Sequence, residues 1–433
     1  MEVVPRLPPQ TRERIAYVAI GAASGTNLEI AVLDVDRRSP RHGQILHRTA
    51  LPEAIRDVSS LAFNRSDSTA PDRYLLLTSP TGRCLCIIDT HPDPYAPQVA
   101  HIVTADEFAD DAEAEPKAIC CRGNGLGIFW VSPSQPAGAV AILDPQDYAR
   151  QRSNGLAPDP GECSYGFACH PVHGTVVTSA WGSAEMAAAG LRPDLLMSAA
   201  YGHSLHVWDV VNGTHEQEIR LGDQATVLEL CAANDPARSY GFAAVTASLE
   251  DLSAAVWIWH RDDTVADGKR WQARKVIELP AETAPSDGLP QLLSSFGAVP
   301  PLVTHLDLTD DDRYLLVSCW GSGELKRYDV SNPFAPTLTD SVRLGGVLCE
   351  TPHPASPNQI LGGGPGRSLV NADGSRVYVA SSISAPWDEQ FYPRGAEHWL
   401  ARVDVDPDGT MGVDSEFFPD LKGSPVLALC LAQ

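Results

Sequence analysis

Residues 303–331 read VTHLDLTDDDRYLLVSCWGSGELKRYDVS, and this stretch decides the fold. Residues 303–308 alternate in polarity, with His305 and Asp307 on one side and Leu306 and Leu308 on the other, as in a short strand. An acidic turn follows, and residues 313–320 and 324–329 then form a hairpin around Gly-Ser-Gly. Short antiparallel strands joined by tight turns are typical of one blade of a β-propeller.

The last strand of this unit ends in Asp, and similar strands recur about seven times along the 433 residues, roughly 50–75 residues apart. They lie at residues 30–36, 85–90, 140–145, 205–210, 256–261, 326–331 and 401–406. We therefore predict an all-β chain that forms a single β-propeller domain over residues 1–433, with about seven blades. A propeller leaves a central channel, and the residues that begin each inner strand point toward it.

The composition is that of a globular protein, with 43% hydrophobic and 20% charged residues. The formal net charge of −23 repels phosphate backbones and anionic lipids, so neither nucleic acid nor a membrane is an expected partner. The acidic segment at residues 106–115 is expected to be a solvated loop. No run of 18 apolar residues is present, so no membrane span is expected.

Ten cysteines without a small-domain framework favour reduced thiols, and the first residues lack the apolar core of a signal peptide. Both observations predict a cytoplasmic protein. Helical signal is thin, and its best candidate is residues 183–197, inside the fourth unit, where Pro193 interrupts it. We expect a short helical insertion at about residues 182–200 over one mouth of the channel, acting either as a lid or as a cap.

Four segments together resemble the selenium-binding protein family, which includes the methanethiol oxidases. They are LDVDRRSPRHGQILHR at 33–48, YGHSLHVWD at 201–209, LTDDDRYLLVSCWGSGELKRYDVSNPFAPTLT at 308–339 and SAPWDEQFYP at 384–393. Their order and spacing hold over nearly the whole chain. The resemblance implies a propeller of about seven blades and does not by itself carry the activity.

Members of the oxidase type are thought to hold copper with channel histidines, and imidazole suits copper. This chain departs from that pattern at most of the matching positions. Where the resemblance implies histidines, the chain has Ser59, Ser60, Ile119, Arg122, Asn234, Ser322 and Leu429. The selenium-linked cysteine of the family matches Ser66, and only His173 remains at a matching histidine position. The resemblance therefore favours the scaffold and argues against copper chemistry, and no metal site and no cofactor are expected.

The same resemblance, with the geometry of blades, indicates which residues line the channel. Candidate catalytic residues are His305, Glu229, Arg367, Tyr165 and Arg122. Candidate substrate-binding residues are Ser59, Ser60, Trp320, Trp387, Phe391 and His173. Such side chains can donate and accept protons and orient a small organic molecule. Polar residues near a propeller axis can equally bind only water or bridge neighbouring blades.

The leading hypothesis is a metal-independent enzyme for biosynthesis that acts on a small oxygenated molecule by acid–base assisted dehydration, isomerisation or cyclisation. A hetero-Diels–Alder cyclisation is one concrete version. His305 and Glu229 would exchange protons, while Arg122, Arg367 and Tyr165 would hold oxygens as negative charge develops. The alternatives are a copper-dependent methanethiol oxidase and a binding propeller without catalysis.

Overall fold

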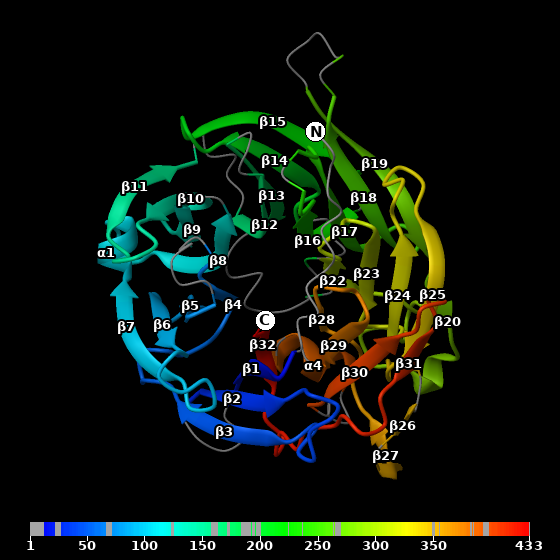
Figure 1. Cartoon of the computed structure of the whole chain (residues 1–433). Coiled ribbons are helices and arrows are strands. Elements are labelled where there is room, and N and C mark those ends of the chain that lie inside the picture. Colours follow the sequence, from blue (N-terminus) through cyan, green and yellow to red (C-terminus); the bar gives the residue numbers. More distant parts are fainter. Residues whose placement is uncertain are drawn as a thin grey trace, which may run out of the picture.

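Seven four-stranded antiparallel sheets stand in a ring around a central axis within the described part of the chain (Figure 1). The computed structural model describes residues 13–21, 27–65, 72–122, 125–156, 163–170, 174–182, 192, 195, 201–223, 225–235, 237–262, 264, 270–348, 351–354, 356–381, 383, 385–392 and 398–432. The predicted all-β propeller of about seven blades is confirmed. Among these residues, no helix has both the length and the apolar character needed to cross a membrane.

Six blades use four strands that follow one another in sequence, with the first strand innermost. The first three of these blades are β4 (Ser60–Phe63), β5 (Tyr74–Ser79), β6 (Cys84–Asp89), β7 (Gln98–Thr104); β8 (Glu115–Arg122), β9 (Gly125–Ser132), β10 (Gln135–Leu143), β11 (Arg150–Gly155); and β12 (Cys163–His170), β13 (Thr175–Gly182), β14 (Ser204–Asp209), β15 (Thr214–Arg220). The next three are β16 (Ala225–Ala232), β17 (Tyr240–Ser248), β18 (Ala254–Arg261), β19 (Trp271–Leu279); β22 (Val303–Leu308), β23 (Tyr314–Cys319), β24 (Glu324–Asp329), β25 (Thr337–Arg343); and β28 (Arg367–Val370), β29 (Arg376–Ala380), β30 (Leu400–Val405), β31 (Met411–Val413). The connections carry two small hairpins, β20 (Glu282–Thr283) with β21 (Ala298–Val299) and β26 (Thr351–His353) with β27 (Ser356–Leu361), and a 3-10 turn at Ser286–Gly288.

The aspartate at the end of the third strand recurs because it closes the following turn. In five blades its Oδ1 accepts the backbone N–H two residues further on, at 2.8–3.1 Å. These residues are Asp34, Asp89, Asp144, Asp209 and Asp329. A short carboxylate that caps a turn in this way replaces a backbone hydrogen bond that the chain reversal would otherwise leave open.

The seventh blade joins the two ends of the described chain. It contains β1 (Ile15–Ile20), β2 (Glu29–Asp34), β3 (Ile45–Ala50) and, innermost, β32 (Val426–Leu431), which pairs antiparallel with β1 (Figure 1). This pairing gives β1 a second partner and joins the two ends of the described chain in one sheet. The cores lie between neighbouring blades, as where Tyr17 of β1 packs with Leu75 and Leu77 of β5.

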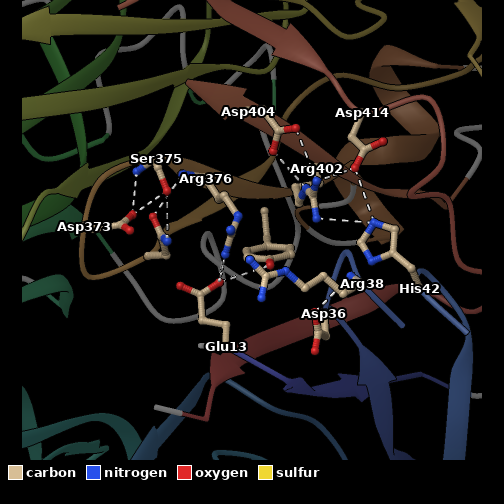
Figure 2. A network of polar contacts seen from close by, with 12 residues as sticks. Glu13, Asp36, Arg38, His42, Asp373, Ser375, Arg376, Arg402, Asp404 and Asp414 are labelled. Carbon is tan, nitrogen blue, oxygen red and sulfur yellow. Dashed lines mark hydrogen bonds and ion pairs between the residues drawn. The ribbon is translucent and has the colours of Figure 1, made fainter. Parts of the chain in front are cut away.

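A polar network crosses the interface between the closing blade and the β28–β31 blade (Figure 2). Arg402 of β30 is fully buried and lies 2.5 Å from an oxygen of Asp414, which is 3.3 Å from Nε2 of His42 in the turn after β2. Glu13, just before β1, accepts a hydrogen bond from the hydroxyl of Tyr378 at 3.3 Å. Polar side chains therefore join the residues around β1 and β2 to the β28–β31 blade.

The acidic segment after β7 is not the solvated loop that we expected. Its first part is the helix α1 (Ala105–Ala109), in which the side chain of Phe108 is fully buried. Glu107 starts the helix by accepting hydrogen bonds from the backbone N–H and the hydroxyl of Thr104, at 2.7 and 2.8 Å. The acidic residues therefore lie on the outer face of a helix that contributes to the core.

The expected insertion at about residues 182–200 lies almost wholly outside the described residues, and its helix and its role stay predictions. A different short helix, α4 (Ala385–Phe391), lies near the axis of the ring (Figure 1). Trp387 and Phe391 of α4 pack with Trp320, which follows β23, and with Trp181 of β13. This helix thus belongs to an aromatic cluster at the end of the ring where the inner strands begin.

Candidate active site

Four polar side chains lie on four successive inner strands around the channel. They are Tyr165 of β12, Glu229 of β16, His305 of β22 and Arg367 of β28. Glu229, His305 and Arg367 are half-buried, and the positive charge of Arg367 acts on all three of the others. The structure therefore brings together four of the five predicted catalytic residues.

Irregular strand pairing takes two of these residues, Tyr165 and Glu229, out of the regular alternation. The pairing of β12 with β13 shifts between Ser164 and Phe167, and the pairing of β16 with β17 shifts between Val227 and Leu230. Tyr165 and Glu229 lie inside these shifts. Bulges bend a strand locally and re-aim side chains, and they are frequent next to active sites.

Buried hydroxyl groups fix the relative position of the inner strands. The hydroxyl of Ser179 accepts the N–H of Gly166 at 2.8 Å and donates to the carbonyl of Leu228 at 2.9 Å. It thereby joins the residue after Tyr165 to the residue before Glu229. Gly166 is required here, because a Cβ at this position would overlap the Leu228 carbonyl oxygen.

The same device positions His305 and Arg367. The hydroxyl of Thr304 donates to the carbonyl of Gly366 at 2.9 Å, so the residues before His305 and Arg367 are joined. The chain enters β28 through a glycine-rich run, in which a Cβ on Gly364 would overlap the carbonyl oxygen of Trp320. Gly364 therefore serves close packing of backbones.

Two side chains of β22 accept hydrogen bonds from backbone N–H groups on the edge of β28 that faces them. The N–H of Ser368 donates to Nδ1 of His305 at 3.3 Å, and the N–H of Val370 donates to a carboxylate oxygen of Asp307 at 2.5 Å. Because Nδ1 of His305 accepts a hydrogen bond, the proton of the neutral ring lies on Nε2. Sequence reasoning noticed that Asp307 shares a face with His305 but did not include Asp307 in the site.

Burial changes the proton affinity of the site residues. It raises the pKa of Glu229 to about 7, although the charge of Arg367 opposes this change. Tyr165 is 37% exposed, yet the protein surrounds its ring closely enough that burial raises the pKa of its hydroxyl. Burial, and then Arg367, lower the pKa of His305 to about 3, so this ring stays neutral at physiological pH. At neutral pH Glu229 can gain or lose a proton. So can Asp307, whose pKa burial also raises to about 7, but its carboxylate already accepts the N–H of Val370.

The described channel residues do not fit the copper site that the resemblance implies. His305 carries its proton on Nε2 and uses Nδ1 as an acceptor, so neither nitrogen offers a free lone pair to a metal. Arg367 places a cation beside the same ring. No group of three or more His, Cys, Asp or Glu in the described part of the chain is arranged to hold a metal ion.

In the described part of the chain, the predicted substrate-binding residues Ser59, Ser60 and His173 are not seen in contact with the four channel residues. Ser59 is 2.9 Å from the hydroxyl of Thr78 and donates to the carbonyl of Pro116 at 3.3 Å, so it bridges two blades. Ser60 begins β4 and is half-buried. His173 lies outside the described residues.

Arg122 was expected to begin an inner strand, and this expectation is wrong, because Arg122 is the last residue of β8. The pairing irregularity of β8 lies between Pro116 and Ala118, so Lys117 occupies the bulge. Arg122 follows that bulge by several residues, or roughly 15 Å along a strand. Nζ of Lys117 lies 2.7 Å from a carboxylate oxygen of Glu115, so the two side chains form an ion pair.

The predicted aromatic residues form a compact cluster over the site. Trp320, Trp387 and Phe391 are 5% exposed or less, and the hydroxyl of Tyr392 donates to the carbonyl of Trp320 at 2.7 Å. The ring of Tyr165 lies 5.1 Å from that of Trp181, which belongs to the same cluster. The aromatic residues therefore support one side of the site through Tyr165 and Trp181.

Removal of the Ser179 hydroxyl tests the positioning of Tyr165 and Glu229. In Ser179→Ala, the N–H of Gly166 and the carbonyl of Leu228 both lose a buried partner, and we expect a loss of about 1–3 kcal/mol in unfolding free energy. Urea denaturation measures this change. Ser331→Ala is the matched control, since Ser331 is exposed and its side chain interacts, among the described residues, only with Asp329 two residues before it. Equal stability of the two variants would show that the hydroxyl does not hold these strands.

Comparisons with known proteins cover nearly the whole chain. Residues 8–430 match the family model described as 56kDa selenium binding protein (SBP56). A Xenopus tropicalis protein named methanethiol oxidase is 28% identical and is covered over 92% of its length by 96% of this chain. The human methanethiol oxidase is 26% identical, with 96% of this chain and 91% of that protein covered. The X-ray structure of a hypothetical selenium-binding protein from Sulfolobus tokodaii has a TM-score of 0.84 and 31% identity, covering 97% of this chain and 94% of that one.

These relatives overturn the leading functional hypothesis. Cyclisation, isomerisation or dehydration is wrong, because the similar proteins are named methanethiol oxidase, and nothing in the comparisons points to a cyclase. They support the alternative of thiol oxidation. The expectation failed because proton-exchanging and oxygen-binding side chains in a channel define a kind of pocket and are shared by many reactions.

Proposed function

This chain belongs to the 56 kDa selenium-binding protein family, and on that premise we propose that it oxidises a small thiol in its central channel. The observation that carries the proposal is the placement of Glu229 and Arg367 on inner strands of one channel, a carboxyl group with a pKa of about 7 and a guanidinium group whose charge acts on it. Thiol oxidation begins most readily from the thiolate, and these two groups suit thiolate formation.

Glu229 is the base in this proposal. Its carboxylate would accept the proton of the substrate S–H group, and the positive charge of Arg367 would favour the charged, proton-accepting form of that carboxylate. Tyr165 and Nε2–H of His305 are further donors for the substrate. Electrons would then pass from sulfur to dioxygen, which is the acceptor that the relatives' name implies. Because the described donor set does not fit copper, no step is assigned to a metal.

The direct test uses the purified full-length protein with methanethiol and with ethanethiol. We expect thiol-dependent uptake of dioxygen together with loss of free thiol, each abolished by heat denaturation of the protein. The absence of both signals between pH 6 and pH 9 would refute the proposed oxidation.

Elemental analysis of the same preparation addresses the metal. We expect activity that does not follow the copper content from batch to batch and that survives dialysis against a chelator, because the described channel lacks an imidazole cage. One copper ion per chain, with activity lost on chelation and restored by copper, would contradict this prediction. Residues outside the described ranges would then have to supply the ligands.

A further inference from the structure

The channel contains two opposite charges that do not pair with each other. The ion pairs of the described residues include neither Arg367 nor Glu229, so no nitrogen of one lies within 4.0 Å of an oxygen of the other. Neither side chain makes a hydrogen bond to the described protein, although both are half-buried. Comparable half-buried charges elsewhere are paired, such as Lys326 with Glu324 at 2.9 Å. Unpaired charges that are partly removed from water are costly unless a ligand compensates them.

The blade order explains why the two groups stay apart. Glu229 lies on β16 and Arg367 on β28, and the inner strand β22 with His305 stands between them (Figure 1). The backbones on both sides are held by the hydroxyls of Ser179 and Thr304. A molecule that compensates both charges must therefore extend past His305 and carry a different group at each end.

The hydrogen-bonding groups define those two ends. Arg367, Nε2–H of His305 and the hydroxyl of Tyr165 can all donate, whereas Glu229 in its charged form only accepts. A guanidinium group matches a carboxylate with two parallel hydrogen bonds. The thiol of the proposed substrate supplies the proton that Glu229 accepts. Methanethiol has one polar atom and would leave one of the two charges without a partner.

We propose that the preferred substrate is a short mercapto acid, with its carboxylate on Arg367 and its S–H group toward Glu229. This inference rests on the proposed thiol oxidation and narrows the class of thiol. Binding involves one proton transfer: the S–H bond breaks, the electron pair stays on sulfur, and the proton moves to the Glu229 carboxylate. The subsequent oxidation uses dioxygen, as for any other thiol substrate of the enzyme.

The test compares mercaptoacetate with its neutral methyl ester and with ethanethiol. For the wild-type protein we expect a kcat/KM for mercaptoacetate about 10–100-fold above that for either neutral thiol, the range set by a charge-assisted hydrogen bond in a partly buried site. In Arg367→Gln this preference should vanish through a higher KM for mercaptoacetate, and Arg367→Lys should retain part of it. Arg313→Gln, which removes a largely exposed arginine of the turn between β22 and β23, should keep the wild-type preference.

A binding measurement separates this inference from the oxidation itself. (Methylthio)acetate has the carboxylate but no S–H group, and calorimetry should detect its binding to the wild-type protein and at least tenfold weaker binding to Arg367→Gln. An equal or greater rate with the ester, or a preference that survives in a folded Arg367→Gln, would overturn the mercapto acid. Lack of calorimetric binding would overturn it as well. If no thiol is oxidised while (methylthio)acetate binds through Arg367, the proposed oxidation fails and the carboxylate subsite stands.

Discussion

Glu229→Gln should lower kcat for thiol oxidation about 10²–10⁴-fold, which is the usual contribution of a general base. The amide keeps the size of the side chain but cannot take a proton from sulfur. Glu216→Gln is the matched control, since Glu216 is an exposed residue of the outer strand β15. Dioxygen uptake at saturating thiol measures both variants. A Gln variant with wild-type kcat would remove Glu229 from the proton transfer.

The pH profile gives this prediction a second readout. Because burial raises the pKa of Glu229 to about 7, kcat/KM of the wild type should rise tenfold per pH unit below that value and level off above it. The Gln variant should lose this inflection in its residual activity. A change of structure alone would lower the rate at every pH and leave the inflection in place.

The Glu229→Gln variant, which should lose activity, should gain free energy of unfolding. The raised pKa means that folded Glu229 holds its proton between about pH 4.3, the ordinary glutamate value, and about pH 7, where the unfolded chain has released it. The contribution of this group to stability is therefore lost as pH rises through that window. At pH 8, Glu229→Gln should unfold with about 1–2 kcal/mol more free energy than the wild type, after allowance for partial exposure. Gain of stability with loss of activity is typical of a strained functional charge.

The blades could be predicted from the sequence because their signals are local. The aspartates that end the third strands, such as Asp89 and Asp329, cap turns two residues away, so the pattern and its cause lie in the same short segment. Closure of the ring could not be predicted in this way. Ala16 of β1 pairs with Leu431 of β32, and nothing local in either strand specifies a partner at the other end of the chain.

Four of the five candidate catalytic residues could be placed from the sequence, and the fifth could not. Tyr165, Glu229, His305 and Arg367 were placed by the family resemblance, which supplied the register of the inner strands. Arg122 was misplaced because the bulge that marks the level of the site in β8 lies at Lys117, and single-residue bulges leave no periodic signal. The helices α1 and α4 have five and seven residues, too few for a recognisable helical period.

Asp414→Ala should destabilise the folded protein by about 3–5 kcal/mol, because the change leaves Arg402 buried beside a weakened set of anions. Arg402 is fully buried, and its remaining carboxylate partner, Asp404, is 24% exposed (Figure 2). Chemical denaturation followed by intrinsic tryptophan fluorescence measures the effect. The control is Asp408→Ala, which removes an exposed carboxylate from the turn before β31.

The double variant Arg402→Met, Asp414→Leu separates loss of the pair from loss of packing. If the single change acts by leaving a buried cation, the apolar pair should recover most of the lost stability, since replacement of a buried ion pair is often close to neutral.

The stabilisation that Asp414 provides depends on pH in one direction. Burial acts to raise the pKa of Asp414, but the N–H of Glu416 and the charge of Arg402 outweigh it and lower the pKa. The stabilisation is therefore present above the ordinary aspartate value of about 3.9 and is lost as pH falls below it. His42 and Asp414 join the closing blade to the β28–β31 blade, so acid should first loosen the closing blade. Hydrogen exchange in β1 and β32 at pH 3 should rise before exchange in β16 and β17, and simultaneous loss of protection in all four strands would contradict a closure that depends on this network.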